Sequence, residues 1–274
     1  MVFEYKKWDE FCKKLCDAGI IGIPACKVQK EKYLVLKHDV ETDVSRALEL
    51  AKIEHKYGHC GSFYVQAYLM QKPENTEMLR KIQSYGAEIS YHYDVMDSNK
   101  GDIEKAISEF EENRQIFEGS GFRIVTVCQH GNPVVERVGY TSNRDFFRNA
   151  AVQERYPEIA DIMVDFKEKF ETDYTYYSDA GRKFKMIYDP INNDRVDSED
   201  KNIEYENLDE LFEVIKNGNN AIVSTHPHRW CKSAVEYTVK NGVFKAVKGT
   251  AKVLLHIPFM KKIMGRFYYL AKKI

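Results

Sequence analysis

The chain has 274 residues, enough to bury a large core in one α/β barrel-sized domain or in two smaller domains. It carries 41 Lys and Arg against 42 Asp and Glu, so its net charge of −1 gives no overall field that would favour a nucleic-acid partner. No stretch approaches the roughly 20 apolar residues of a membrane span, and the first residues lack the apolar run of a signal peptide. Six cysteines without metal-finger spacing predict reduced thiols and a cytoplasmic location.

Extended and helical patterns alternate along the first half of the chain. Residues 6–18 predict an amphipathic helix, and residues 33–39 predict the first strong strand. Further helices are expected from Thr42 to Gly58, at 75–85 and at 102–118, and further strands at 61–66, 87–92 and 123–128. Such alternation implies a parallel sheet or barrel with right-handed crossovers.

The second half is less regular. Between 134 and 183 the pattern loosens, with a strand at 174–178, and the polar stretch 189–206 has the length of a lid or a mobile connection. A helix at 208–216 precedes the last predicted strand at 220–225. From residue 240 onward there are nine Lys or Arg and no Asp or Glu, interspersed with large apolar residues. This basic segment is expected either to pack its apolar face on the domain or to lie at an anionic membrane surface.

The stretch from Tyr33 to Glu41 is the most informative about function. Its apolar run ends in His38-Asp39-Val40-Glu41 and gives way at once to a helix. Ligands and catalytic side chains collect at the carboxyl ends of strands in α/β proteins, because the loops there form a crevice. A solvated turn followed by a helix cap explains the same residues about as well.

Three later histidines, His92, His130 and His226, also follow predicted strands directly. A lone histidine is more often structural, but several at equivalent strand ends would meet at one mouth. Carboxylate and imidazole groups are the ligands that zinc prefers in a catalytic site, where three protein ligands leave a position open for water. Such a water has its pKa lowered toward neutrality and becomes a nucleophile.

Five short motifs occur in order between residues 33 and 230. They are His38-Asp-Val-Glu41, Gly86-Ala-Glu-Ile-Ser-Tyr-His92-Tyr-Asp94, His130-Gly-Asn-Pro, Ser178-Asp179-Ala-Gly-Arg182 and Thr225-His226-Pro-His-Arg229-Trp230. Together they resemble the polysaccharide deacetylase superfamily (carbohydrate esterase family four-like), and more narrowly a divergent branch associated with surface-polysaccharide biosynthesis. The resemblance implies a distorted (β/α)7 barrel over residues 1–230, including a helical lead-in at 1–30, and leaves 231–274 as a basic amphipathic extension.

The same resemblance implies a metal-dependent hydrolase that removes an acyl group, usually acetyl, from an N-acylated sugar. By motif position, Asp39 is the expected general base, Glu41 and His92 are expected metal ligands, and His226 is the expected general acid for the leaving amine. These roles agree with simple chemistry, because a carboxylate beside a cation can take a proton from water while a histidine across the site protonates the amine.

Two positions depart from the family pattern. Met96 stands where the second histidine of the second motif is usual, and Glu41 stands where Asp is common. We therefore expect His130 or Asp94 to supply the third ligand of a divalent cation, with zinc as the expected metal. His38 is expected to support the site from the first motif.

Other motif residues are expected around the substrate. Asp179 and Arg182 would form an ion pair that orients a catalytic group or the sugar, and a purely structural pair is an equal alternative. His228, Arg229 and Trp230 would line a substrate channel, because Trp can stack on a sugar ring and Arg can meet a phosphate. A strand end stopped by proline with an aromatic plug is the competing interpretation.

The sequence thus predicts a cytoplasmic, metal-dependent hydrolase of a saccharide amide bond in surface-glycan assembly. If the basic extension contacts the inner face of a membrane, a lipid-linked sugar is the natural substrate. Two other functions fit the same residues. One is a barrel without catalysis that binds sugars or serves as a scaffold, which Met96 favours. The other is a hydrolase of another C–N bond, such as a formamide or a cyclic amide.

Overall fold

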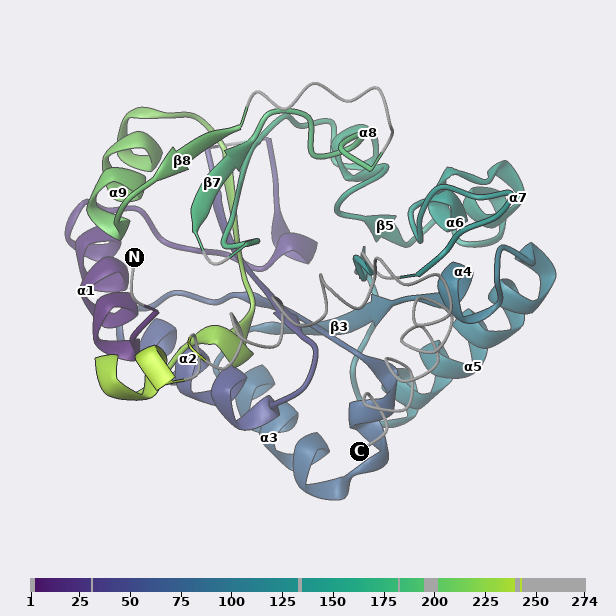
Figure 1. Cartoon of the computed structure of the whole chain (residues 1–274), viewed down its shortest axis with the longest axis horizontal. Helices are drawn as coiled ribbons and strands as arrows, with labels where there is room; N and C mark the ends of the chain where they lie inside the picture. The colour runs from purple at the N-terminus through teal and green to yellow at the C-terminus, as the bar shows by residue number, and fades with distance from the viewer. Residues whose placement is uncertain are drawn as a thin grey trace.

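A computed structural model of the chain describes residues 3–30, 32–132, 135–181, 183–194, 202–239 and 242. Within these residues, strands form one sheet in the order β5-β4-β3-β2-β1-β9-β6-β7-β8 (Figure 1). Their bounds are β1 Leu34–Val40, β2 Ser62–Val65, β3 Glu88–Tyr93, β4 Thr126–Gln129, β5 Ala160–Asp161, β6 Thr175–Ser178, β7 Phe184–Ile187, β8 Ile203–Tyr205 and β9 Ala221–Thr225. All neighbouring strands in the series β5-β4-β3-β2-β1-β9-β6 pair in parallel. Strand β7 pairs with β6, and β8 pairs with β7, both in antiparallel fashion.

The sheet is open. In the described part of the chain, β5 and β8 stand at its two edges and do not pair with each other. The predicted α/β class with a mostly parallel sheet is therefore confirmed, whereas a (β/α)7 barrel is not confirmed. The antiparallel strands β7 and β8 were not predicted, because the residues around β8 read as a polar loop. The last strand, β9, lies between β1 and β6 and so places the ends of the predicted motifs beside each other.

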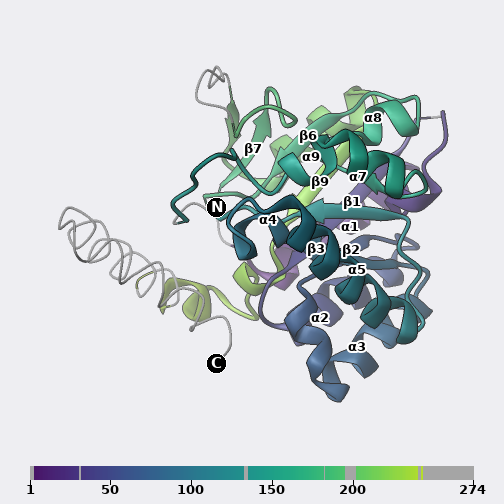
Figure 2. The ribbon, with the colours of Figure 1, turned by 90° about the vertical axis from the view of Figure 1, so that its right-hand side faces the viewer.

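The longer helices pack around the outside of the sheet (Figure 1). They are α1 Tyr5–Asp17, α2 Val44–Lys56, α3 Pro73–Ser84, α5 Ile103–Gly119 and α9 Leu208–Asn217. Shorter elements connect them, namely η1 Ala25–Lys27, η2 Ala67–Gln71, α4 Val95–Ser98, α6 Asp145–Arg148, α7 Ala150–Arg155, α8 Phe166–Lys169 and η3 Pro227–Arg229. Figure 2 shows α2 and α3 lying together beneath the strands. None of the helices in the described ranges is both long enough and apolar enough to cross a membrane.

Local sequence explains where the helices form. In α1 the buried residues Trp8, Phe11 and Leu15 recur at helical spacing, as predicted. Helix α2 is capped by the Asp43 side chain, which accepts a hydrogen bond from the Ser45 amide at 3.0 Å, so the cap lies one residue after Thr42, where the helix was expected to begin. The predicted helix at 102–118 corresponds to α5, with its cap at residue 102.

The two faces of the sheet have different cores. Leu34 and Leu36 of β1 point outward into the core beneath α1 and α9, whereas Val35 points inward and packs with Tyr176 and Ile222. This follows from the two-residue alternation of a strand. Toward the carboxyl ends of the strands the inward positions become polar, and this is where the predicted site residues lie.

Candidate functional site

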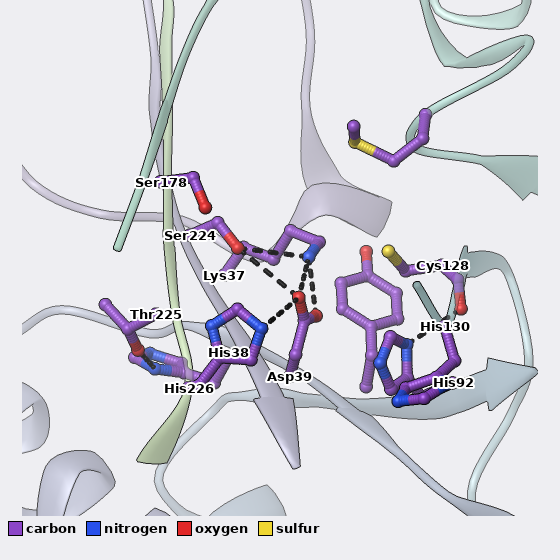
Figure 3. Close-up of polar contacts among 12 residues, drawn as sticks. Lys37, His38, Asp39, His92, Cys128, His130, Ser178, Ser224, Thr225 and His226 are labelled. Carbon is purple, nitrogen blue, oxygen red and sulfur yellow. Dashed lines mark hydrogen bonds and ion pairs between the residues drawn. The ribbon is translucent and has the colours of Figure 1, made fainter. Parts of the chain in front are cut away.

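Strand β1 presents a polar series on its inner face. Lys37, Asp39 and Glu41 occupy alternate positions, so their side chains leave the strand in the same direction. Lys37 is 1% exposed and Asp39 is 6% exposed, while the Glu41 side chain is 22% exposed. Figure 3 shows Lys37 and Asp39 pointing toward each other, with His92 and His226 on either side of Asp39. The series therefore runs from the buried interior toward the open end of the sheet.

Asp39 is held as a carboxylate by the lysine two residues before it. Lys37 Nζ lies 2.5 Å from Asp39 Oδ1 and 2.6 Å from Oδ2, and it also donates to Ser224 Oγ at 3.2 Å. Burial alone would raise the pKa of Asp39, but Lys37 above all, together with the neighbouring His92 and His226, outweighs burial and lowers this pKa to about 2. Asp39 is thus ionised at neutral pH and able to accept a proton.

Glu41, His92 and His130 converge into a group that fits a divalent cation. One potential ligand atom from each lies within 4.8 Å of the other two. Glu41 Oε1 is 3.3 Å from His130 Nε2 and 4.0 Å from His92 Nε2. One carboxylate with two imidazoles is a donor set used by catalytic zinc sites. Of the two candidates for the third ligand, the structure brings His130 to this position and not Asp94.

Hydrogen bonding selects the tautomer of His92. Its Nδ1 lies 3.0 Å from the carbonyl oxygen of Cys128, which can only accept, so the proton is on Nδ1. Burial lowers the pKa of His92 to about 4, despite the nearby carboxylate of Asp39, and the ring is therefore neutral. The Nε2 lone pair faces Glu41, as a metal ligand requires. The Cys128 carbonyl fixes the orientation of the ring, as hydrogen-bond acceptors beyond the ligands do in metal sites.

The loop after β4 holds His130 in place through main-chain contacts. The His130 amide donates to the Tyr93 carbonyl at 2.7 Å, and its own carbonyl accepts from Asn143 Nδ2 at 2.8 Å. Asn143 also bonds Asp97, which pairs with Arg137 at 2.8 Å. This chain of polar contacts stiffens the loop that presents the imidazole.

His226 follows β9 and is oriented by a buried carboxylate. Asp179 Oδ1 lies 2.5 Å from His226 Nδ1, and Asp179 Oδ2 accepts from the His226 amide at 3.0 Å. Burial would raise the pKa of Asp179, but Arg229, with Nη1 at 2.7 Å, and His226 together lower it. His226 Nε2 is left facing Glu41 at 3.7 Å and Asp39 Oδ2 at 3.9 Å. The predicted base Asp39 and the predicted acid His226 therefore lie close to each other and next to Glu41.

Two predicted site residues have other roles. His38 lies on the opposite face of β1, fully buried, with Nδ1 at 2.7 Å from Thr225 Oγ1 and Nε2 at 2.8 Å from Glu54 Oε1. It cannot support the site directly, because adjacent strand residues point to opposite faces. Trp230 is fully buried against the rings of Phe3 and Trp8, so the predicted stacking on a sugar is wrong and the aromatic plug is what forms.

The remaining supporting residues are placed as follows. Asp94 lines a separate hollow of about 220 Å³ together with Tyr68 and other residues. His228 does reach the site, with Nδ1 at 3.9 Å from Glu41 Oε2, and burial lowers its pKa to about 4. Arg229 binds Asp179. The predicted partner of Asp179, Arg182, lies outside the described residues.

Met96, which stands where the motif resemblance led us to expect a histidine, is a core residue. It is 4% exposed in α4 and belongs to the hydrophobic core that also contains Val95 and Phe110. The third position is instead filled from the neighbouring strand β4, through His130.

Sequence reasoning missed Lys37, Ser224 and Cys128. Cys128 forms a second, overlapping group with Asp39 and His92, whose potential ligand atoms also lie within 4.8 Å of one another. A lysine inside a fully buried strand was the available signal, since a buried ammonium needs a carboxylate partner. The alternation Lys37, Asp39, Glu41 would have identified that partner.

No family model, curated protein or solved structure matches this chain. The chemistry of the site therefore has to be inferred from the arrangement of its side chains. It combines an ionised carboxylate, an oriented imidazole and a donor set that fits a divalent cation, all at the carboxyl ends of adjacent strands. These groups can accept a proton, donate a proton and polarise a bound carbonyl.

Proposed function

We propose that the chain is a metal-dependent hydrolase that removes an N-acyl group, in the simplest case acetyl, from a saccharide, on an architecture of the polysaccharide deacetylase type. The supporting observation is the approach of Glu41 to both His130 and His226, at 3.3 and 3.7 Å, beside the ionised Asp39. The five ordered sequence motifs supply the substrate class, because they resemble enzymes that act on N-acylated sugars.

The proposed reaction divides the work among six side chains. A divalent cation, with zinc proposed, held by Glu41 and the two imidazoles beside it would polarise the acyl carbonyl and acidify a water. Asp39 accepts the proton of the attacking water as the new C–O bond forms, a role that requires the ionised carboxylate present at neutral pH. His226 then gives a proton from Nε2 to the leaving amine, while Asp179 holds Nδ1 and balances the imidazolium charge. The acyl group leaves as a carboxylic acid and the sugar as an amine.

The test combines metal analysis with amine release. Full-length protein is expected to retain metal and to release amine from N-acetylated saccharides. Asp39→Asn is preferred to Asp39→Ala, because Asn can still accept from the buried Lys37. It is expected to keep its metal and to lose about 100-fold or more in turnover, as is His226→Gln. His55→Gln is the matched control, since His55 is exposed and stacks on Tyr85.

The outcomes separate the competing functions. Wild-type protein that holds no metal and matches Asp39→Asn in every assay would contradict catalysis. Saccharide binding without amine release would favour the sugar-binding or scaffold alternative. Release from formamides or cyclic amides, but not from acetylated sugars, would keep the hydrolase and change its substrate.

We further propose a cytoplasmic location with a lipid-linked saccharide as substrate. All six cysteines are free thiols, which supports a reducing compartment. The nine Lys or Arg after residue 239 would favour an anionic membrane surface. Apart from residue 242, that segment lies outside the described residues. Liposome flotation with and without residues 250–274 tests this, and equal recovery of both proteins would refute membrane contact.

A further inference from the structure

The Lys37 ammonium lies in the interior of the site that we propose to be catalytic. Its side chain is 1% exposed and contacts both carboxylate oxygens of Asp39, at 2.5 and 2.6 Å. Tyr64 and Tyr176 place their rings 5.5 and 5.9 Å from Nζ. Ser224 accepts a further hydrogen bond at 3.2 Å. Lys37 is thus almost completely enclosed by protein.

Two groups of potential metal ligands overlap in this site. Glu41, His92 and His130 form the outer group, and Asp39, His92 and Cys128 form the inner group. A thiolate, an imidazole and a carboxylate are chemically suited to zinc. The inner group has a sulfur atom where the outer group has a second imidazole. Its carboxylate is also already paired with an ammonium, which contacts both oxygens.

We propose that the Lys37 ammonium takes the place of a second metal ion in this centre. Through Asp39 it confines metal binding to the outer group and keeps the carboxylate free of the metal and available as a base. A second metal ion that shared His92 with the first is not needed to balance the negative charge of Asp39. The Lys37 ammonium already supplies a positive charge beside this carboxylate. The inference rests on the proposed metal centre and makes Lys37 a positioning residue.

The substitution Lys37→Met tests this role, because Met has a similar length and no charge. Wild-type protein is expected to bind a single equivalent of Co²⁺ without a thiolate-to-metal charge-transfer band. Lys37→Met is expected to bind a second equivalent and to show that band, since Asp39 and Cys128 become available together. The double variant Lys37→Met/Cys128→Ser should lose the band. Metal stoichiometry and the absorption spectrum are read without any activity assay.

Other results would overturn the inference. A thiolate band in wild-type protein would show that Cys128 binds metal with Lys37 in place, and a folded Lys37→Met protein with one equivalent and no band would show that no second position exists. Should Lys37→Met fail to fold, Cys128→Ser decides the question, because unchanged metal uptake supports the inference and lost uptake overturns it.

The same experiment separates this inference from the proposed function. If wild-type protein binds no metal but Lys37→Met binds one equivalent through Cys128, the lysine does block the inner group and the outer centre is refuted. If neither protein binds metal, both proposals fail.

Discussion

Replacing Asp161 by Asn tests the electrostatics of the sheet interior. Asp161 ends β5 and is fully buried, where its Oδ2 accepts from the Tyr93 hydroxyl at 2.5 Å and its Oδ1 from the Met163 amide at 2.6 Å. Burial outweighs these hydrogen bonds and raises the pKa of Asp161 from 3.8 to about 7. Asn keeps the shape and can satisfy both partners, because the Tyr93 hydroxyl can accept as well as donate.

The direction and size of the change in unfolding free energy with pH follow from the linkage between proton binding and folding. With a folded pKa above the unfolded value, native Asp161 keeps its proton while the unfolded chain loses it, so this group destabilises the fold progressively as pH rises from about 4 to about 7. A rise of roughly three units corresponds to about 4 kcal/mol when complete. Between pH 5 and pH 8 the free energy of unfolding of wild-type protein should therefore fall by about 3 kcal/mol relative to Asp161→Asn.

Urea unfolding of both proteins at pH 5, 6, 7 and 8 measures this difference. The two stabilities should be closest at pH 5, and the variant should be the more stable protein at pH 8. Curves that run parallel across this range would refute the reasoning, since they would mean that Asp161 ionises at the same pH in the folded and unfolded chain.

Three further predictions concern the site. His130→Ala should weaken zinc affinity at least about tenfold in competition with a chelator, because it removes one of three ligands, and an unchanged affinity would place the metal elsewhere. Asp179→Asn should lower turnover about 100-fold through His226 while metal content stays constant, as steady-state kinetics with metal analysis can establish. His38→Ala should cost about 2 to 4 kcal/mol in urea unfolding, because Glu54 loses a buried partner, yet leave zinc affinity intact. Loss of zinc from that variant would contradict the assignment of His38 to the opposite face.

Much of the candidate site could be predicted because its signals are local. Strand ends are visible as apolar runs that stop at polar residues, and Asp39, His92 and His226 each follow such a run. Parallel strands align their carboxyl ends at one edge of the sheet, so polar residues at the ends of strands that lie near each other can form one site. Helix positions were predictable for the same reason, since the buried apolar residues of α1 recur at helical spacing in the sequence.

Other features depend on which strands become neighbours. The contact of Lys37 with Ser224 exists because β9 inserts beside β1, a pairing between segments 187 residues apart. The choice of His130 over Asp94 likewise required the pairing of β3 with β4. No local pattern encodes these choices, because they are decided by the packing of whole elements.

The sequence by itself determined the α/β class, the strand ends and the kinds of side chain that gather there. The tertiary structure decided that the sheet stays open, that His38 and Trp230 belong to the core, and that a lysine neutralises the carboxylate at the centre. The physical reason is the distance along the chain over which each effect acts. Strand alternation and helical periodicity depend on a few neighbouring residues, whereas burial, charge pairing and sheet order depend on contacts between residues far apart in the sequence.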